Sequence, residues 1–484
     1  MRWSARKGVS MKRLLFATIL SLGTALLAYA DDSLTVPAPP QGPVGARLLN
    51  REVPPLRPFA LPDADTALSA RIAKQGSVSA DDQQLLRGAY LARAGDCVAC
   101  HTSKGGPPFA GGLALASPIG AIYSTNITPD REHGIGNWSY EDFARLMRTG
   151  VTKAGYTVYP AMPYPSYSRL SEQDMHDLYA YFTRAVPASA QANRVNDIPW
   201  PLSMRWPLAL WRKLFAPTPA PFAAPAASDQ ELARGAYLVE GLGHCGSCHT
   251  PRSTTMQEKS LRDDSSRLFL SGGQVVDGWI VPSLRNEHGG GIAGWSEADL
   301  VEFLRTGRNQ FTASFGAMND VVEHSMQYLS QADLKAMSRY LLSLPPRNDA
   351  QPYRYDEVSA KAAYEGRPST QGAALYLDRC AACHRSNGTG YGKAFPALAG
   401  NPVLQGKDAS SAIRIILQGG RQPATDSATA GLVMAPYAGL LNDQQIAEVT
   451  SYIQTAWGNR GATASAADVA RIRKTARPVQ ALTP

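Results

Sequence analysis

The sequence predicts an all-α protein built from three tandem domains of similar design. A C-x-x-C-H motif occurs three times and accounts for all six cysteines. A short helical pattern precedes each copy, and an amphipathic helical pattern closes each repeat. Pro-rich stretches separate the repeats, as linkers between domains do. The chain has 484 residues, which is enough for about three domains.

The cysteine motif indicates a covalent cofactor. Two thiols on one helical turn can bind the vinyl groups of a haem, and the adjacent His can bind its iron. A structural zinc site needs a second cysteine pair at matching distance, and a thioredoxin-type motif needs no following His. We therefore expect three haem c groups. The candidate thiols are Cys97, Cys100, Cys245, Cys248, Cys380 and Cys383, and the candidate proximal ligands are His101, His249 and His384.

The predicted helices follow one order around each motif. The pattern Arg-Gly-Ala-Tyr-Leu precedes the motif at 87–91 and 234–238, with a looser copy at 372–377. After the motif, Gly-Ile-x-x-Trp-Ser leads into a helix that ends at Arg-Thr-Gly, over 134–150 and 291–307. The Ser is a natural N-cap and the Gly a natural C-terminal stop. A weaker third copy of this helix covers 413–420, and the closing helices begin at Ser171, Ser330 and Asn442 and carry Tyr181, Tyr340 and Tyr452.

This order is typical of class I cytochrome c-like domains, in which a haem supplies much of the interior of a small helical fold. We expect residues 31–82 to form a Pro-rich, extended arm, and residues 460–484 to form a tail with a weak helical pattern. The expected segments are a signal peptide at 1–30, the arm at 31–82, domain 1 at 83–186, a Pro/Trp-rich linker at 187–227, domain 2 at 228–345, a linker at 346–365, domain 3 at 366–459 and the tail at 460–484.

The first thirty residues have the form of a secretory signal. Lys12 and Arg13 precede an apolar run over 14–27, and Ala-Tyr-Ala at 28–30 fits the cleavage rule. A retained anchor is the alternative, although the run is shorter than the ~20 residues that a span needs. These residues hold five basic side chains and no acidic one, so removing them lowers the net charge from +8 to +3. No basic cluster indicates nucleic-acid binding, and no later segment is apolar enough to span a membrane.

A Met is expected as the sixth iron ligand in each domain. His/Met ligation suits electron transfer, whereas an open iron could do chemistry. In the third repeat, Met434 is the only Met after His384, and no other His follows. In the first repeat, Met162 lies in a Pro-Ala-Met-Pro loop, whereas Met147 and Met175 lie inside amphipathic helical patterns and are better suited to the core.

In the second repeat, two methionines are candidates for the distal iron ligand. Met318 lies eleven residues past Gly307, which matches the spacing of the first repeat, and we favour it over Met326. Met256 and Met337 are the other methionines of this repeat. Histidine in this role would give low-potential, bis-His haems, and a lone His is more often a surface residue. The remaining histidines are His133, His176, His244, His288 and His324.

The chain resembles the triple-haem cytochrome c subunit of membrane-bound periplasmic dehydrogenases, such as quinohaemoprotein alcohol dehydrogenase and gluconate, sorbitol or fructose dehydrogenases. The resemblance covers about residues 83–460. It rests on the haem motifs, Ala-Gly-Asp-Cys-Val-Ala-Cys-His-Thr at 94–102, Ser-Thr-Asn-Ile-Thr-Pro-Asp at 124–130, Pro-Trp-Pro-Leu-Ser-Met-Arg-Trp-Pro at 199–207 and Phe-Gly-Ala-Met at 315–318 with Val-Val-Glu-His-Ser at 321–325. The long arm before residue 83 departs from the family, as does Met-Ala-Pro at 434–436, where the family more often has Met-Pro.

The resemblance implies a role in a complex. A catalytic partner subunit would oxidise an alcohol, sugar or aldehyde with flavin or pyrroloquinoline quinone, and a small third subunit can accompany the pair. This chain would pass the electrons to ubiquinone at the periplasmic face of the cytoplasmic membrane, and it would hold no substrate site apart from a role in quinone reduction. The alternatives are a relay subunit of a molybdenum hydroxylase and a haem peroxidase, although a peroxidase needs an open iron.

One further stretch has the composition of a segment that contacts a membrane or another protein. Residues 200–215 combine Trp and Leu side chains with Arg205, Arg212 and Lys213, which is the composition of an interfacial segment. We expect this stretch to contact either the membrane surface or the partner subunit. Packing between the domains is the alternative, because aromatic side chains serve both purposes.

Overall fold

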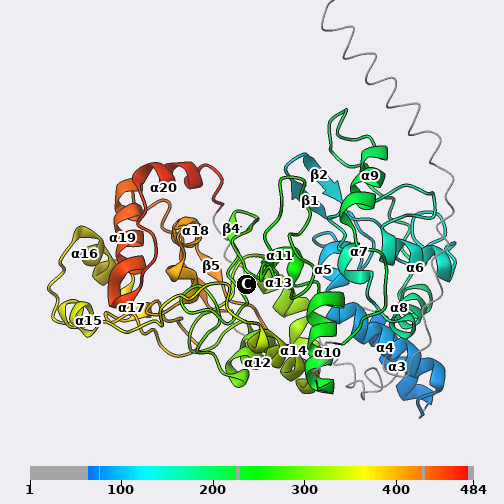
Figure 1. Ribbon diagram of the computed structural model, residues 1–484, viewed down its shortest axis with the longest axis horizontal. Coiled ribbons are helices and arrows are strands. Elements are labelled where there is room, and N and C mark those ends of the chain that lie inside the picture. The colour runs from blue at the N-terminus through cyan, green and yellow to red at the C-terminus, as the bar shows by residue number, and fades with distance from the viewer. Residues whose placement is uncertain (1–63, 76, 225–228, 428–430, 478–484) are drawn as a thin grey trace, which may run out of the picture. The chain divides into compact units, whose positions relative to one another are not determined.

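A computed structural model of the chain describes residues 64–75, 77–224, 229–427 and 431–477. Helices dominate this part of the chain, and the strands form three small antiparallel pairs (Figure 1). The predicted signal peptide at 1–30 and most of the predicted arm lie outside the described residues. The pairs are β1 (Ala114–Ser117) with β2 (Gly120–Tyr123), β3 (Val275–Val276) with β4 (Trp279–Ile280), and β5 (Gly420–Arg421) with β6 (Val433–Met434).

The first repeat has the expected order of helices. Its helices are α4 (Ala80–Ala94), α5 (Cys97–His101), α6 (Tyr140–Thr149), α7 (Tyr164–Tyr167) and α8 (Glu172–Arg184). The side chains of Ser139 and Ser171 cap α6 and α8 by accepting hydrogen bonds from backbone N–H groups. Gly150 ends α6 in the left-handed conformation, which glycine adopts without a Cβ clash. The predicted caps and stop are therefore confirmed.

The second repeat follows the same order with one extra residue. Its helices are α10 (Gln230–Tyr237), η1 (Leu238–Leu242), α11 (Gly246–His249), α12 (Glu297–Thr306), α13 (Ala317–His324), η2 (Met326–Tyr328) and α14 (Gln331–Ser343). Arg234 and Cys245 are eleven positions apart, whereas Arg87 and Cys97 are ten apart. The η1 segment is a π-helix, so the extra residue is accommodated as a bulge just before the motif.

The third repeat extends beyond its predicted bounds on both sides. Its helices are α15 (Glu357–Tyr364), α16 (Gln371–Arg379), α17 (Ala381–His384), η3 (Pro402–Gln405), α18 (Ser410–Gln418), α19 (Asp443–Thr455), η4 (Ala456–Gly458) and α20 (Ala466–Arg473). Helix α15 lies in the predicted linker at 346–365, and Ala360 joins the core of this repeat. Helix α20 confirms the weak helical pattern of the tail, and it packs through Val469 and Ile472.

The predicted arm is helical, not extended, where the structure describes it. Helix α3 (Ala64–Gln75) precedes α4, which begins with a capping box between Ser79 and Asp82. The last proline of the arm is residue 62, so no ring interrupts a helix after it. Asp65 on α3 pairs with Arg93 and accepts a hydrogen bond from the Tyr181 hydroxyl, which ties α3 to the first repeat.

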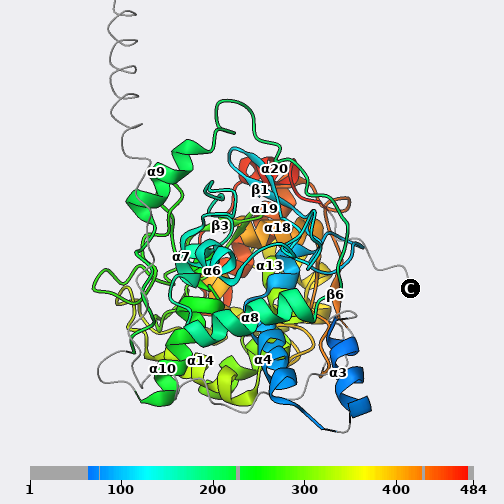
Figure 2. The ribbon, with the colours of Figure 1, turned by 90° about the vertical axis from the view of Figure 1, so that its right-hand side faces the viewer.

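A glycine lets the closing helix cross the first helix closely in each repeat. The helix pairs are α4 with α8, α10 with α14, and α16 with α19, and the first two pairs lie side by side in Figures 1 and 2. A Cβ on each glycine would lie only 2.0–2.2 Å from a carbonyl oxygen of the closing helix. The glycines are Gly88, Gly235 and Gly372, and beside them lie Tyr181, Tyr340 and Tyr452 of the closing helices.

The first two repeats share one hydrophobic core, and the third has a core of its own. Leu91 and Met175 of the first repeat belong to the same cluster as Leu242 and Met337 of the second. Cytochrome c-like helices are thus present throughout, but the first two repeats do not have the separate cores that tandem domains would have.

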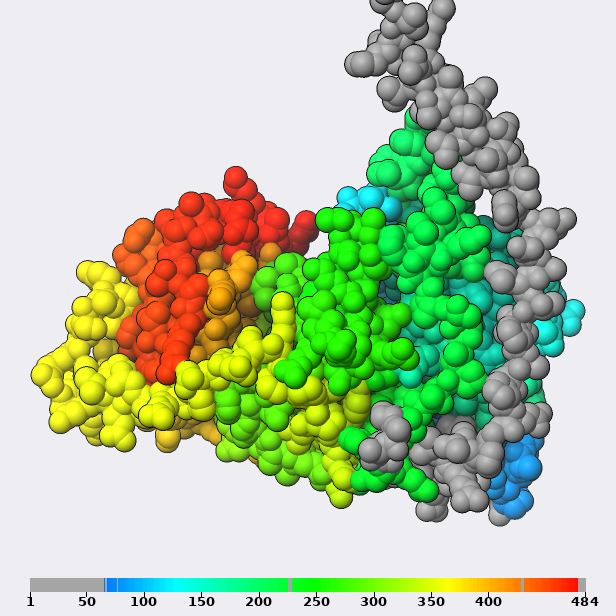
Figure 3. All heavy atoms as spheres, viewed as in Figure 1, coloured from blue at the N-terminus to red at the C-terminus, as the bar shows by residue number. Residues whose placement is uncertain are grey.

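The segment between the first two repeats contains an exposed helix, α9 (Trp206–Phe215). It lies at an edge in Figure 2, and the surface of this segment, in green, projects at the upper edge of the described part in Figure 3. None of its residues is buried, and Trp206 and Leu214 are 62% and 63% exposed. Within the described residues, no helix combines the length and the apolar character needed to cross a membrane.

Candidate cofactor sites

The histidine of each C-x-x-C-H motif is held in the same way. Its ring Nδ1 lies 2.7–2.9 Å from a backbone carbonyl oxygen, and because a carbonyl can only accept, Nδ1 carries the proton. This tautomer leaves the Nε2 lone pair available for a metal, and metal-binding histidines are commonly oriented by such a bond. The pairs are His101 with Thr125, His249 with Pro282, and His384 with Pro396.

The protonation of these groups suits a haem site. Burial lowers the pKa of all three histidines, that of His249 to about 4, so the rings stay neutral and can bind a metal. Burial also raises the pKa of Cys97, Cys245 and Cys380 to about 12. A thiol with so high a pKa holds its proton at neutral pH, which disfavours a redox thiolate at these positions. None of the six cysteines forms a disulfide.

A glycine that the sequence patterns did not reveal supports each histidine. Its N–H donates to the carbonyl of the motif histidine over 2.7–3.1 Å, and its φ is positive. A Cβ there would lie 2.4–2.7 Å from the carbonyl carbon of the residue that accepts the Nδ1 proton. The glycine therefore holds the histidine backbone against the segment that orients its ring. These residues are Gly111, Gly272 and Gly390, at distances of 10, 23 and 6 residues from the histidine, so no fixed spacing reveals them.

The methionines separate into two groups. The candidate distal ligands Met162, Met318 and Met434 are partly exposed and lie against the hydrophobic cores. Four others are buried within the shared core: Met147, Met175, Met326 and Met337. The core role predicted for Met147 and Met175 is therefore confirmed. A buried sulfur has core partners on all sides, so the burial of Met326 favours Met318 as the ligand of the second repeat.

Helix α13, which carries Met318, contacts both neighbouring repeats. One side lies against α5 of the first repeat. From the other side, both Glu323 oxygens bind Arg421 of the third repeat at 2.6 and 3.0 Å. Arg421 is on β5, which pairs with the strand of Met434. The segments that carry two candidate distal ligands are therefore joined by an ion pair.

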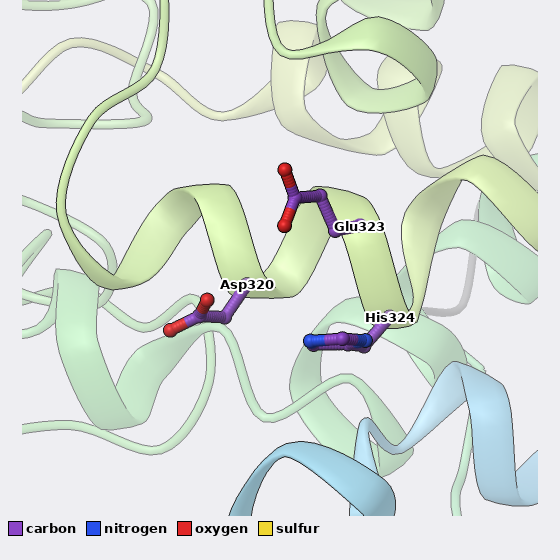
Figure 4. A group of neighbouring side chains, drawn as sticks. All are labelled: Asp320, Glu323 and His324. Carbon is purple, nitrogen blue, oxygen red and sulfur yellow. The ribbon is translucent and has the colours of Figure 1, made fainter. Parts of the chain in front are cut away.

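Three side chains of α13 lie close enough together to suggest a metal site, namely Asp320, Glu323 and His324. Glu323 is already bound by Arg421 and by the backbone N–H of Ala424. Asp320 and His324 project from the other side of the helix, toward the segment of the first repeat drawn in blue (Figure 4). The ligand atoms of the three side chains lie within 4.8 Å of one another, but both Glu323 oxygens are already occupied by Arg421, so we assign no metal site to them.

The first two motifs are in contact through His244. This residue directly precedes Cys245, and its Nε2 lies 3.2 Å from the carbonyl oxygen of Gly95, two residues before Cys97. Its ring also meets the edge of Tyr167. His244 is therefore placed between two attachment turns.

Repeated C-x-x-C-H turns with this histidine geometry, set in a helical fold, define a c-type cytochrome. A haem held at such a turn supplies one-electron chemistry at its iron. The comparisons with known proteins agree with this class. A family model for cytochrome c matches residues 85–184 and 369–457.

The similar proteins narrow the class further. The chain is 53% identical to the gluconate 2-dehydrogenase cytochrome c subunit of Pantoea cypripedii, over 82% of this chain and 90% of the relative. It is 48% identical to the cytochrome c subunit of alcohol dehydrogenase (quinone) of Gluconacetobacter polyoxogenes, over 85% and 89%. It is 35% identical to the fructose dehydrogenase cytochrome subunit of Gluconobacter japonicus, over 85% and 87%. The chain therefore belongs to the cytochrome c family, within the group formed by these dehydrogenase cytochrome subunits.

Proposed function

We propose that this chain is the three-haem electron-transfer subunit of a membrane-bound dehydrogenase and passes electrons from a catalytic partner to ubiquinone. The observation that carries the proposal is the repeated histidine geometry, present at all three C-x-x-C-H turns. In this proposal, domains at 83–186, 228–345 and 366–459 each hold one haem. The thioether bonds form at Cys97, Cys100, Cys245, Cys248, Cys380 and Cys383, the proximal ligands are His101, His249 and His384, and the distal ligands are Met162, Met318 and Met434.

The catalytic partner in this proposal is a flavin or pyrroloquinoline quinone subunit that oxidises an alcohol, sugar or aldehyde. The names of the relatives support it, because they include gluconate, alcohol and fructose dehydrogenases. These relatives do not favour the alternative of a molybdenum-hydroxylase relay. The presence of a candidate Met ligand in every repeat disfavours a peroxidase, which needs an open iron position.

The first experiment counts the haems and identifies their ligands. Purified mature protein is expected to hold three haems per chain and to show the far-red charge-transfer band of thioether–iron ligation. Met434→Leu should remove about a third of this band, and Met326→Leu should leave it unchanged. Fewer than three haems, or ready binding of carbon monoxide at every iron, would reject the proposal.

We also propose that the chain attaches peripherally to the periplasmic face of the membrane through α9. Trp206, Leu210 and Leu214 are exposed on this helix, and Arg205 and Lys213 supply positive charge near them. An apolar face with a cationic rim suits a bilayer that contains anionic lipid. Trp211 does not belong to this face, because its Nε1 donates to the carbonyl of Thr255 and holds α9 to the second repeat.

The attachment is tested with Trp206→Ser combined with Leu214→Ser. The double variant should keep its haems and lose most of its binding to vesicles that contain phosphatidylglycerol. Val195→Ser, at another residue that is highly exposed, is the matched control and should bind normally. Unchanged vesicle binding by the double variant would exclude α9 as the attachment.

A further inference from the structure

A hairpin of the second repeat contacts the segments of both candidate iron ligands of that repeat. It consists of β3, β4 and the residues that follow β4. The carbonyl of Pro282, at its end, accepts the Nδ1 proton of the proximal candidate His249 at 2.9 Å. Trp279, in β4, packs on the ring of Phe315 at 4.7 Å between centroids, and Phe315 is three residues before Met318. One hairpin therefore bears on the proximal and on the distal candidate.

The contact between Trp279 and the Met318 segment is close. Gly316, with a φ of 62°, is the N-cap of α13, and Met318 is the second residue of that helix. A Cβ at Gly316 would lie 2.8 Å from the indole, so the glycine lets the ring rest against the backbone where the helix begins. Trp279 is 8% exposed, yet it lies outside the hydrophobic cores of the described residues. Its position therefore depends on a few specific neighbours.

Two side chains of the third repeat hold this hairpin from α18. Nε of Arg414 donates to the carbonyl of Gly278, at the turn of the hairpin, at 2.9 Å. The Arg414 guanidinium also lies 5.9 Å from the centroid of the Trp279 ring. The Ser411 hydroxyl accepts from the backbone N–H of Ile280 at 2.9 Å. The residues on both sides of Trp279 in the sequence are thus bound to the third repeat.

The first repeat holds its corresponding hairpin, β1 with β2, in another way. Ile122 is three residues before the carbonyl that binds the motif histidine, where the second repeat has Trp279. Pro160 is two residues before Met162, where the second repeat has a glycine. Ala121 exchanges two backbone hydrogen bonds with Asp197, at 2.9 and 3.0 Å. The hairpin of the first repeat is thus bound by the segment that follows its own helices, whereas that of the second is bound by the next repeat.

We propose that the third repeat, through Arg414 and Ser411, fixes the hairpin at 275–282 so that Trp279 holds the Met318 segment in its ligating position. Trp279 is then a positioning residue, since the groups around a metal ligand set its orientation. This inference rests on the proposed function, because it requires Met318 to be a distal ligand. The distal ligation of the second haem thus depends on the docking of the third repeat.

The test uses the full chain with its haems and added imidazole, which competes with a Met ligand for ferric iron. Trp279→Leu should lower by about tenfold the imidazole concentration that removes about a third of the far-red band, because the ring contact with Phe315 is lost. Arg414→Met should lower it by about threefold, since one hydrogen bond to the hairpin is lost. Trp279→Phe keeps an aromatic ring and should stay near the parent value. Combined with Met318→Leu, neither change should have a further effect, which identifies the haem.

Arg471→Met is the matched control, since it removes an exposed arginine of the third repeat that pairs with Asp468 of its own helix at 3.1 Å. A shift in this variant equal to that of Arg414→Met would overturn the proposal. A parent-like titration in Arg414→Met, or an effect that persists beside Met318→Leu, would also overturn it, and this holds even if Trp279→Leu fails to fold. Three haems with unchanged titrations in the site variants would reject this inference alone. Fewer than three haems, or no far-red band, in the parent protein would reject the proposed function instead.

Discussion

The junction between the first and second repeats differs from the junction between the second and third. In the first junction, Tyr90 donates to Asp333 across the contact at 2.7 Å, and Tyr237 donates to Asp174 in the reverse direction at 2.5 Å. Each tyrosine oxygen also accepts from a backbone N–H at the start of the opposite closing helix. Such reciprocal contacts arise when two copies of one fold meet by a twofold rotation. All four side chains are buried, within or beside the shared core.

The second junction is polar and is not reciprocal. Glu323 binds Arg421, the Asn319 amide donates to the Arg421 carbonyl, and Arg308 donates to Gln422. The Glu323 and Arg421 side chains keep 15% and 26% of their surface exposed, and the two cores on either side stay separate. The second repeat therefore shares a single hydrophobic core with the first repeat, whereas it contacts the third repeat through polar side chains at the surface.

The largest expected effect concerns the buried guanidinium at the first junction. Arg234 donates twice to Asp333 at 2.9 Å, and both side chains are almost fully buried. Arg234→Met should cost about 3–5 kcal/mol, because Asp333 loses its guanidinium while remaining inside the protein. Urea unfolding followed by haem absorbance should show the first two repeats weakened together.

The matched control is Arg339→Met, which removes an arginine from α14, the closing helix that carries Asp333. Arg339 pairs with Asp229 and Glu231 at the surface, where ion pairs contribute little. Equal losses in the two variants would contradict the view that the first junction belongs to the folding core.

The sequence predicts the helices of this junction but not their pairing. Local patterns are enough to predict the helix caps, such as Ser171 and Ser330, and the helices that follow the Arg-Gly-Ala-Tyr-Leu repeats and the motif cysteines. The structure has the predicted caps and helices in place. Tyr90 belongs to one of those patterns, yet its partner Asp333 is 243 positions away, and no local pattern records such a contact. The sharing of one core escaped prediction for the same reason. The helix α15 escaped because its polar sequence looked like a linker.

The second prediction uses a difference within the first junction. In the first repeat Arg87 binds Asp177 at 2.8 Å, and the second repeat has Ala336 at the position of Asp177. Asp174 therefore accepts a hydrogen bond from the Tyr237 hydroxyl, and no guanidinium of the described residues lies at hydrogen-bond distance from it. Burial raises the pKa of Asp174 from 3.8 to about 6. Between these values the unfolded chain has released the proton that the native carboxyl still holds. Stability should therefore fall as the pH rises through this range, by on the order of 3 kcal/mol.

Asp174→Asn should remove this loss, so the variant should match the parent near pH 4 and exceed its stability at pH 7. Unfolding free energies measured by urea titration at several pH values give the comparison. Parallel curves for the parent and the variant from pH 4 to 7 would show that Asp174 does not titrate in this window.

The smallest effect is expected at the second junction. Glu323→Gln should cost about 1 kcal/mol or less, because the ion pair with Arg421 is partly exposed and screened by solvent. The loss should appear as easier separation of the third repeat, since no shared core holds it to the second. Limited proteolysis in the connecting segment at 346–356 should therefore speed up, while the urea midpoint of the first two repeats stays at the parent value.

A double-mutant cycle with Arg421→Gln isolates the pair from other effects of either change. The double variant should be no more susceptible to proteolysis than Glu323→Gln alone, because one interaction is lost in both. If the first two repeats lost stability along with the third, the three repeats would unfold cooperatively through α13. The second junction would then belong to the folding core, as the first one does. An unchanged midpoint would instead mean that the interface between the second and third repeats can open without unfolding the first two.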